Sequence, residues 1–430
     1  MIEYNVNVGL LGCGNVGAAL AQLIEAQGDA IAARTGIRLN LAKVAVRSRS
    51  RDRGVAFTDG VLTTNPADVI DNADIDVIVE VMGGIEPARE LITKALNSGK
   101  PVVTANKELL ANFGAELYAI ADSAGLDLLF EAAVAGGIPL MRPLRESLVG
   151  EPIHRVMGIV NGTTNFILSS MTNSGESYSD ALSEAQALGF AERDPTADVE
   201  GYDAGAKAAI IASIAFGAKV VAGDVYHEGI SEITAADIAV ARRMGFVVKL
   251  LAICEQDATT RDISVRVHPA LVPTEHPLAN VSGSYNAVFI EGGAVGSLML
   301  YGRGAGGMPT ASAVLGDLID AASNLSRGTH GAIGTFAKAT IKPIDDTSSE
   351  YSLTLDVVDL PGVLHAVTGA FAAHGVSIRT AEQDGLGDDA RLVFITHIAR
   401  ESDVQATLAA LRKLDVVKRV GSVLRVIGGV

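Results

Sequence analysis

The segment between Gly189 and Lys207 carries residues that could bind and protonate a small polar molecule. Lys207 is the only charged residue between positions 204 and 217, where the chain is otherwise alanine, isoleucine, glycine, serine and phenylalanine. A lysine on such an apolar helix must be buried with a partner or face a cleft, because an isolated buried charge is costly. Asp203 lies four residues earlier, on the same face of the helix. The other carboxylates of the segment are Glu192, Asp194, Asp198 and Glu200.

The alternative without a functional role is an exposed ion pair between Asp203 and Lys207, which would stabilise the helix by only about 0.3–0.5 kcal/mol. The apolar composition of residues 204–217 argues against an exposed helix. We therefore expect the pair to belong to a site.

A glycine-rich turn near the N-terminus predicts dinucleotide binding. Residues 6–11 read as a buried parallel strand, and residues 18–24 read as a helix. Between them, Gly12, Gly14 and Gly17 form the pattern G-x-G-x-x-G in its required context. The first glycine permits the turn, the second lets the backbone approach a pyrophosphate, and the third lets the helix pack on the strand. The free N–H groups of the helix then face the phosphates. The alternative is a glycine turn that only packs.

The residues after the second predicted strand bear on the choice of nicotinamide cofactor. Where an NAD-specific fold places an acidic residue against the ribose, this chain has Arg47, Arg49 and Arg51. Guanidinium groups suit a 2′-phosphate, so the run predicts NADP, with NAD as a possible second cofactor. The alternative is a solvated basic loop.

Composition excludes several function classes. The chain has 430 residues, of which 48% are hydrophobic and 20% charged, so two or three globular domains are expected. A net charge of −16 argues against nucleic acids and anionic membranes as partners. Two cysteines imply no disulfide framework, and no signal or membrane-spanning pattern is apparent. We therefore expect a cytoplasmic protein.

The fold class expected is α/β, with three domains. Residues 1–140 alternate strands and helices, which predicts a Rossmann-like, doubly wound parallel sheet. Residues 141–305 change to long helices and strands of alternating polarity, which predicts an α+β substrate domain; the family resemblance stated below implies that it also serves dimerisation. After a polar linker at 328–349, residues 351–430 read as a βαββαβ, ferredoxin-like unit. That unit carries no candidate catalytic pair, so it reads as a regulatory or assembly module.

A second glycine-rich loop, residues 302–307, opens another helix predicted at 311–322, with Thr310 as its expected N-cap. Gly306 in this loop could close over the cofactor from the far side. The loop could equally be a hinge that returns the chain to the first domain, which residues 306–340 would then complete.

With these pieces in place, the chain resembles the homoserine dehydrogenase family, in its long bacterial form with a C-terminal ACT domain. The resemblance covers essentially the whole chain. It is carried by residues 12–17, 103–107, 131–139, 158–165 and 189–207, and by residues 359–364 and 374–378 of the tail.

The resemblance implies reversible oxidation of L-homoserine to L-aspartate 4-semialdehyde with NAD(P), in threonine, methionine and isoleucine biosynthesis. It implies that Lys207 donates and accepts the proton. Lys107 follows a strand end, where cofactor and substrate meet in open α/β sheets, so it is assigned to positioning both, with a role in proton transfer as the alternative. Glu192 and Asp203 would bind the substrate ammonium. Asp198 would orient Lys207 or the substrate, whereas Asp194 and Glu200 read as solvated or structural. The residues expected at the cofactor are Gly12, Gly14, Asn15, Val16, Gly17, Arg47, Thr104, Lys107, Gly189 and Gly306.

The resemblance also implies a bound sodium or potassium ion. Its ligands would be the main-chain carbonyls of Val134, Gly136 and Ile138, with the Glu131 carboxylate. From the residues alone, the glycines and Pro139 favour a simple tight turn.

Finally, the resemblance implies that the ACT domain binds L-threonine and that the chain forms a homodimer or homotetramer. The expected threonine site lies between paired ACT units, near residues 359–362, Ser377 and Ile378. A tail that only assembles the oligomer is the alternative. Two other functions stay open: a nicotinamide-binding sensor without catalysis, and a dehydrogenase that acts on the α-carbon of an amino acid.

Overall fold

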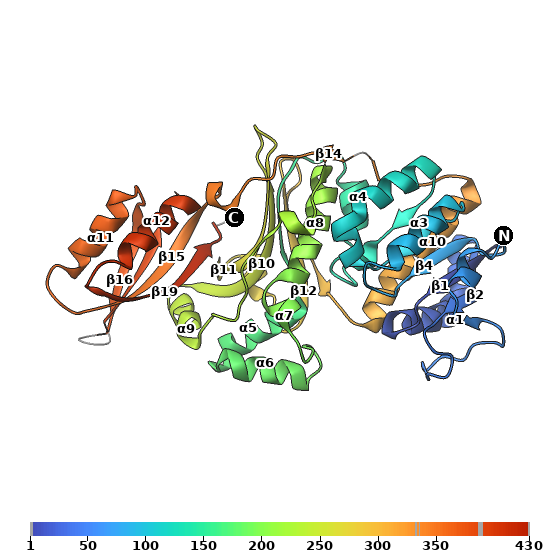
Figure 1. Ribbon diagram of the computed structural model, residues 1–430, viewed down its shortest axis with the longest axis horizontal. Helices are drawn as coiled ribbons and strands as arrows, with labels where there is room; N and C mark the ends of the chain where they lie inside the picture. The colour runs from blue at the N-terminus through green and yellow to red at the C-terminus, as the bar shows by residue number, and fades with distance from the viewer. Residues whose placement is uncertain (1–2, 332, 335, 386–389, 429–430) are drawn as a thin grey trace.

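The computed structural model describes residues 3–331, 333–334, 336–385 and 390–428, and it has three lobes in a row (Figure 1). The N-terminal lobe lies at one end, the C-terminal lobe lies at the other, and the longest helices of the middle lobe lie between them. In the described part of the chain, no helix is both long and apolar enough to cross a membrane.

The first lobe is built on a six-stranded parallel sheet in the order β3-β2-β1-β4-β5-β6. This order confirms the predicted doubly wound sheet, in which ligands bind where the strand order reverses, here between β1 and β4. Two short elements, β3 and α2, were not predicted, because two to four residues carry too little periodicity. The elements are β1 (Tyr4–Leu11), α1 (Asn15–Thr35), β2 (Ile37–Ala45), β3 (Leu62–Thr63), α2 (Ala67–Ile70), β4 (Val77–Glu80), α3 (Ala88–Asn97), β5 (Val102–Thr104), α4 (Lys107–Ala124) and β6 (Leu128–Leu129).

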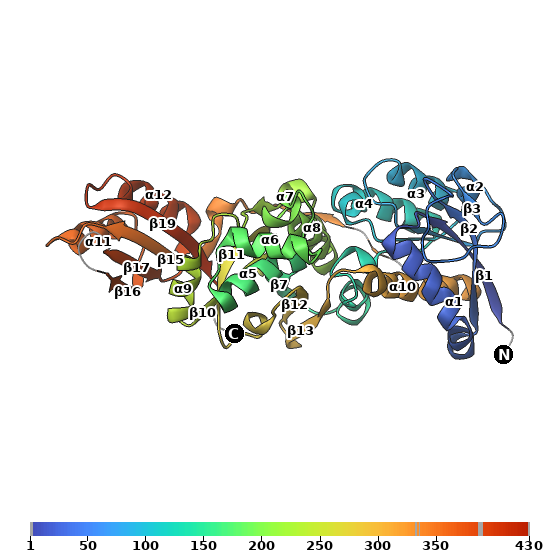
Figure 2. The same ribbon diagram turned by 90° about the horizontal axis from the view of Figure 1, so that it is seen from below.

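Helix α10 (Gly307–Arg327) returns to this sheet from much later in the chain (Figure 2). Its buried side chains Val314 and Leu318 share one hydrophobic cluster with strand residues such as Leu10. The expected N-cap at Thr310 is wrong. The helix begins four residues earlier, at Gly307, because Gly306 adopts a φ of 117° that lets the backbone turn directly into the helix.

The middle lobe packs helices on one face of an antiparallel sheet made of β13, β12, β7, β10 and β11. Helix α8 lies against β10 and β11, and most of its residues are buried, as its composition predicts. The strands are β7 (Ile153–Ile159), β8 (Ala218–Lys219), β9 (Tyr226–His227), β10 (Phe246–Gln256), β11 (Ile263–Pro273), β12 (Tyr285–Gly292) and β13 (Gly296–Arg303). The α-helices are α5 (Gly162–Ser174), α6 (Tyr178–Ala187), α7 (Thr196–Val199), α8 (Tyr202–Phe216) and α9 (Ala235–Arg243). Short helical turns of the first two lobes are η1 (Glu131–Ala133), η2 (Pro143–Ser147), η3 (Ala222–Asp224) and η4 (Pro277–Asn280).

The C-terminal lobe has the predicted ferredoxin-like arrangement. Its strands are ordered β19-β15-β17-β16, and its two helices enclose a separate hydrophobic core. Its elements are β15 (Ser348–Val357), α11 (Val363–Ala373), β16 (Ile378–Asp384), β17 (Arg391–Thr396), β18 (Ala399–Arg400), α12 (Glu401–Leu411) and β19 (Val417–Val426), preceded by β14 (Ala337–Lys338) and η5 (Ile344–Asp346).

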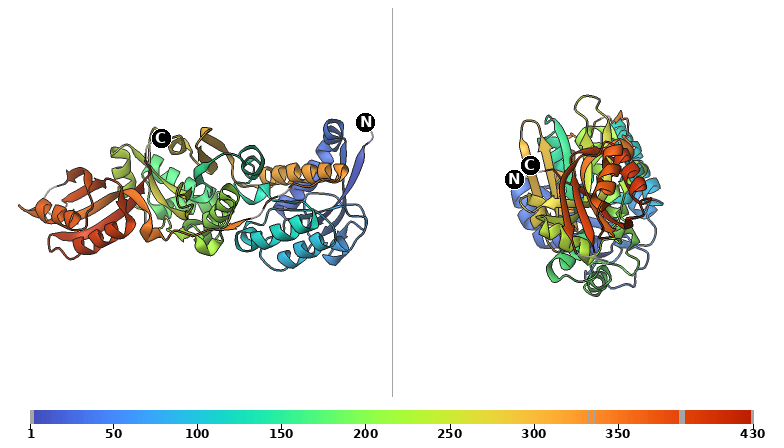
Figure 3. Two further views of the ribbon diagram at one scale, coloured as in Figure 1. Left: turned by 90° about the horizontal axis from the view of Figure 1, so that it is seen from above. Right: turned by 90° about the vertical axis from the view of Figure 1, so that its left-hand side faces the viewer.

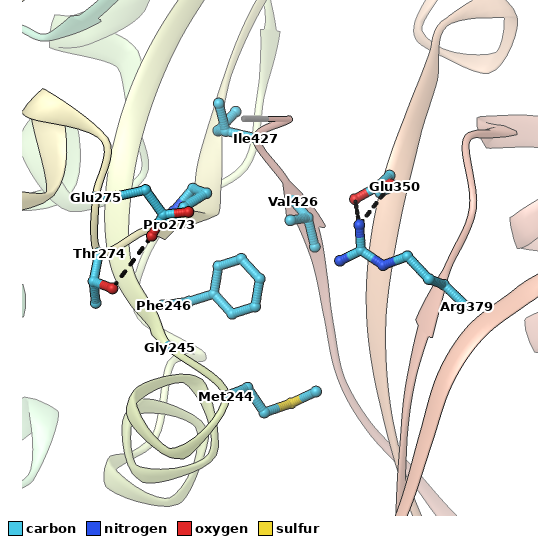
Figure 4. A pocket seen from close by; sticks show the side chains of 10 residues that line it. All are labelled: Met244, Gly245, Phe246, Pro273, Thr274, Glu275, Glu350, Arg379, Val426 and Ile427. Carbon is cyan, nitrogen blue, oxygen red and sulfur yellow. Dashed lines mark hydrogen bonds and ion pairs between the residues drawn. The ribbon is translucent and has the colours of Figure 1, made fainter. Parts of the chain in front are cut away.

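The C-terminal lobe is attached to the middle lobe by more than its linker. Strand β19 pairs in parallel with β11, through Ala270 with Arg425 and Leu271 with Val426, so the two sheets are continuous (Figures 1 and 3). Beside this seam lies a cavity of about 310 Å³, with Phe246 on one wall and the ion pair between Arg379 and Glu350 on the other (Figure 4). A polar linker alone does not predict such a seam.

Candidate active site

Asp203 lies between two lysines at the junction of the first and middle lobes. Its Oδ2 lies 2.6 Å from Nζ of Lys207, and its Oδ1 lies 2.8 Å from Nζ of Lys107. Asp203 and Lys207 are nearly buried, whereas Lys107 is partly exposed. Burial alone would raise the pKa of Asp203, but the two ammonium groups hold that pKa well below its usual range. Burial would lower the pKa of Lys107, and the charge of Asp203 outweighs it and raises that pKa.

Helix α8 places Asp203 and Lys207 on one face, as their spacing predicts. Gly201 caps the helix with a φ of 83°, so Asp203 stands in the first turn, where the helix dipole favours a negative charge. Lys207 also donates to the carbonyl of Val160 over 2.7 Å. An ammonium has three N–H donors. Two have partners among the described residues, which leaves one for the cavity that Lys207 lines.

Asn161 ties two of the acidic residues together. Its Nδ2 donates to Asp198 over 2.6 Å and to Asp203 over 2.9 Å, while its Oδ1 accepts from the backbone N–H of Thr164 and caps helix α5. Burial raises the pKa of Asp198, and this hydrogen bond partly offsets the rise. Asn161 thus fixes the separation of Asp198 and Asp203. The motif around Asn161 contributed to the family resemblance, but its spacing from residues 198–203 gave no signal of this contact.

Replacing Asn161 by alanine is expected to lower kcat about 10- to 100-fold, because it frees both carboxylates to move. The affinity for the cofactor should stay unchanged, since Asn161 lies outside the lining of both cofactor cavities described below. Steady-state kinetics with a fluorescence titration of the reduced cofactor measures both. A variant with wild-type kcat would show that the two carboxylates hold their positions without this amide.

The other predicted carboxylates lie apart from the cluster. Glu192 is exposed, and its side chain has no partner in the described part of the chain. Asp194 accepts from Thr196 in its own loop, which fits a structural role. Glu200 accepts from the hydroxyl of Ser231 over 2.7 Å. The structure therefore brings Asp198 and Asp203 together but not Glu192, whose role in substrate binding stays a prediction.

A cavity of about 300 Å³ joins the two lysines to the glycine-rich turns. Lys107 and Lys207 line one side of it, and Val16 at the start of α1 lines another. Gly304 and Ala305 come from the second glycine-rich loop, and Thr310 comes from the first turn of α10. That loop therefore both lines the cavity and returns the chain to the first lobe. The remaining lining residues are Val81, Met82, Gly83, Ala105, Asn106, Ala132, Ala133, Ala135 and Gly136.

The turn before α1 fits a dinucleotide pyrophosphate. A Cβ at Gly14 would meet no atom within 4 Å, so the space above this residue is free for a ligand. A Cβ at Gly17 would lie 2.4 Å from the carbonyl oxygen of Gly12, so this glycine serves packing. No acidic side chain stands in the first turn of α1, and its free N–H groups can therefore receive phosphate. Gly12 has a φ of 97°, as the turn requires.

A second cavity, of about 350 Å³, lies beside the first turn of α1. Gly14 and Asn15 line it together with Arg51 and Arg53. Arg53 donates to the carbonyls of Cys13 (3.2 Å) and Ser48 and so holds the arginine loop against the glycine turn. Sequence reasoning missed Arg53, because its partners are main-chain carbonyls, and the one that ties it to the glycine turn, that of Cys13, lies 40 residues away. Arg47 is exposed and outside this lining, so its contact with the cofactor stays a prediction.

Three further residues expected at the cofactor have definite positions. Thr104 is completely buried, and its hydroxyl donates to Glu80 over 2.6 Å beneath the turn that follows β4. Gly189 follows α6 with a φ of 77° and lines neither cavity. Gly306 begins α10 next to the lining residues Ala305 and Gly307. Direct contact of these three with the cofactor stays a prediction.

The turn after Glu131 fits a monovalent cation through its main chain. Val134, Gly136 and Ile138 are buried, and their carbonyl oxygens accept no hydrogen bond from the described residues. The Glu131 carboxylate accepts the N–H groups of Leu140, Met141 and Arg142. Its part in binding an ion stays a prediction. Among the described residues, no group of three or more acidic, histidine or cysteine side chains could hold a metal ion.

Family models match three consecutive parts of the chain. Residues 12–131 match "Homoserine dehydrogenase, NAD binding domain", residues 139–319 match "Homoserine dehydrogenase", and residues 351–416 match "ACT domain".

Relatives match the chain along its whole length. A homoserine dehydrogenase of Mycobacterium tuberculosis is 49% identical over 99% of this chain and 98% of its own, and one of Corynebacterium glutamicum is 50% identical over 98% and 95%. The crystal structure of a homoserine dehydrogenase from Thiobacillus denitrificans superposes with a TM-score of 0.93, at 40% identity, over 99% of both chains. A hyperthermophilic archaeal homoserine dehydrogenase in complex with NADPH has a TM-score of 0.63 at 32% identity, covering 74% of this chain and 98% of its own.

Proposed function

The chain belongs to the homoserine dehydrogenase family, and we propose that the cavity of Lys107, Asp203 and Lys207 is where it interconverts L-homoserine and L-aspartate 4-semialdehyde. The observation that carries the proposal is the position of Lys207. It is a nearly buried lysine with one uncommitted N–H, and it faces a cavity shared with the dinucleotide turn.

The chemistry divides between cofactor and protein. A nicotinamide held in this cavity would supply the hydride transfer, from the carbon that bears the hydroxyl group in the oxidation and to the aldehyde carbon in the reduction. In the oxidation, Lys207 acts as the neutral amine and takes the hydroxyl proton, which makes it an ammonium. In the reduction, the Lys207 ammonium gives that proton to the alkoxide oxygen and becomes the amine again. Lys107 carries a positive charge on the same side, which favours the substrate carboxylate and the developing alkoxide.

The substrate ammonium needs carboxylate partners. Asp203 already neutralises two lysines, so we propose that it orders the cluster while contributing to ammonium binding. One oxygen of Asp198 accepts from Asn161, and the other has no partner among the described residues. Glu192 would complete the site from the adjoining loop.

Product analysis tests the proposal. With L-homoserine and oxidised cofactor, the protein is expected to form an aldehyde that a hydrazine reagent traps. A dehydrogenase that acts on the α-carbon would instead release ammonium. Ammonium as the product would overturn the proposed reaction, whatever the rate of cofactor reduction.

We further propose the division into a cofactor domain of residues 1–140 completed by 306–340, a substrate and dimerisation domain of 141–305, and an ACT domain of 351–430. The packing of α10 on the first sheet and the separate core of the C-terminal lobe support it. We also propose that Val134, Gly136 and Ile138 bind sodium or potassium through their carbonyls, with Glu131 beside them.

We propose that NADP is preferred over NAD. Arg51 and Arg53 line the cavity beside Gly14, and the archaeal relative above is described in complex with NADPH. Replacing Arg51 by alanine is expected to lower kcat/KM with NADP⁺ about 10- to 100-fold, as lost hydrogen bonds between charged groups would. The value with NAD⁺ should change less than about twofold, because NAD lacks the 2′-phosphate.

The matched control is Arg47→Ala, which alters the same loop outside the cavity lining. If Arg47→Ala causes the selective loss and Arg51→Ala does not, the phosphate binds at the start of the loop. If neither variant discriminates between the cofactors, arginines do not set the preference.

We propose that L-threonine inhibits the enzyme by binding between paired ACT domains of a homodimer or homotetramer, near residues 359–362, Ser377 and Ile378. Replacing Asp359 by alanine is expected to weaken inhibition about tenfold, within the usual range of allosteric coupling, without changing kcat in the absence of threonine. Titration of activity with threonine measures this. If threonine does not inhibit the wild-type enzyme, the proposal is wrong, and the ACT domain serves only the assembly of the oligomer.

The full-length chain is the right material for this test. A truncated chain ending near Ile341 would lose the pairing of β19 with β11 and expose a strand edge, so its kinetics would mix two effects.

A further inference from the structure

Strand β9 lies between helix α8, which carries Lys207, and the C-terminal lobe. Its residues pair in parallel with β11, Tyr226 with Arg266 and His227 with Val267. The segment that follows β9 contacts the end of α7, where the N–H of Ile230 donates to the carbonyl of Val199 over 2.8 Å. The proposed mechanism gives this strand no role.

The imidazole of His227 rests directly on helix α8 at Gly205. A Cβ at Gly205 would lie only 1.9 Å from Nε2 of His227, so the ring occupies the place where another residue would have its side chain. Gly205 stands midway between Asp203 and Lys207. The ring of Tyr202, in the first turn of α8, packs on the same imidazole with centroids 5.1 Å apart. His227 therefore sets how closely this end of α8 approaches the sheet.

The neighbours of His227 are held by the C-terminal lobe. Arg425, on β19, places Nη1 2.7 Å from Glu228 and Nη2 2.9 Å from Glu401, and its guanidinium lies 5.5 Å from the ring of Tyr226. Arg425 and Glu401 are almost fully buried. Arg425 and Glu401 both belong to the C-terminal lobe, and their burial fixes the guanidinium there, because separating the charges would leave one of them without a partner. The ion pair that crosses to the middle lobe is that of Arg425 with Glu228, whose side chain is partly exposed.

We propose that His227 is a positioning residue for Lys207 and that Arg425 holds it in place through Glu228 and Tyr226, so that the ACT domain fixes the geometry of the catalytic helix. The connection consists of the ion pair between Arg425 and Glu228, the two-residue strand β9, and the ring of His227 on Gly205. It rests on the proposed role of Lys207, and it requires no ligand on the ACT domain.

A paired substitution tests the contact. Gly205→Ala forces the ring or the helix to move, and kcat for homoserine oxidation is expected to fall about 10- to 100-fold, as a displacement of about 1 Å can cause. The dissociation constant of NADPH should stay unchanged. Adding His227→Ala removes the obstructing ring and should restore kcat to within about threefold of His227→Ala alone. The two substitutions are then non-additive, as expected for residues in contact.

Gly316→Ala, in α10, is the matched control, since a Cβ there meets no atom within 4 Å and helical alanine is favourable. If Gly205→Ala fails to fold, His227→Ala alone serves as the test. This variant removes the ring on which α8 packs, and it should lower kcat several-fold while NADPH binding stays intact. Wild-type kcat in Gly205→Ala or in His227→Ala would overturn the proposal. A loss in Gly205→Ala that His227→Ala does not relieve would also overturn it.

The link to the ACT domain has its own comparison. Glu228→Gln weakens the hold of Arg425 on β9 while Arg425 keeps Glu401, and it is expected to lower kcat about threefold or more, less than direct displacement of the helix. Glu232→Gln makes the same charge change nearby, at a residue that does not contact Arg425 in the described chain. Equal kcat values for these two variants would overturn the part of the proposal that concerns Arg425. If Lys207→Ala also kept its activity, the failure would instead lie in the proposed role of Lys207.

Discussion

Replacing Lys207 by alanine is expected to lower kcat for homoserine oxidation about 10²–10⁴-fold, the usual contribution of a positioned acid or base. The reason is geometric: Lys207 offers its one uncommitted N–H to the cavity. Among the described residues that line the cavity, Lys107 is the one other lysine, and it is partly exposed, whereas Lys207 is nearly buried. NADPH binding should be nearly unchanged, as measured by fluorescence titration, because the glycine turn does not depend on this side chain.

Lys219→Ala is the control, since Lys219 is an exposed lysine just beyond the same helix. The variant Lys207→Ala should fold, because Asp203 keeps its contact with Lys107. If Lys207→Ala retains more than about a tenth of wild-type kcat, the loss is far smaller than proton transfer implies, and the assignment is wrong.

Gly14→Val is expected to weaken NADPH binding about 100-fold or more, the equivalent of two lost hydrogen bonds to charged groups. A branched side chain at this position would occupy the space above the turn, where the pyrophosphate approaches. The protein should remain folded, because Gly14 has a φ of −85° and a Cβ there meets no atom within 4 Å. Titration of NADPH fluorescence, with thermal unfolding as a check, measures both effects.

Gly150→Val provides the comparison, because a Cβ at Gly150 also meets open space but lies outside the cavities that Gly14 and Lys207 line. Gly17→Val should instead disturb folding, since its side chain would meet the carbonyl of Gly12. Undiminished NADPH affinity in a folded Gly14→Val variant would place the pyrophosphate elsewhere.

Most of the helices and strands that the sequence predicts correctly follow from patterns among neighbouring residues. The strand, turn and helix around Gly14 were predictable because each step depends on neighbouring residues. The ferredoxin-like tail was predictable from regular alternation of its strands and helices. The predicted start of α10 is wrong, because a hydroxyl at Thr310 is a stronger N-cap signal in the sequence than Gly306, which caps the helix with a positive φ.

Contacts between distant segments were not predictable from local patterns. The pair of Asp203 and Lys207 follows from a spacing of four residues, whereas the contact of Asp203 with Lys107 joins two lobes. The hydrogen bonds of Asn161 to Asp198 and Asp203 cross about 40 residues and left no periodic trace. The seam between β11 and β19 is of the same kind, because parallel pairing of two residues requires no special sequence.

The most direct test of the proposed reaction is the absorbance of reduced nicotinamide after the purified wild-type protein is mixed with NADP⁺ and L-homoserine. We expect a steady rise in that absorbance, which depends on L-homoserine and is nearly abolished in Lys207→Ala at saturating cofactor. A protein that binds NADPH but produces no such rise would be a cofactor-binding sensor, which contradicts the proposed reaction. An undiminished rise in Lys207→Ala would equally contradict the role of Lys207 in proton transfer.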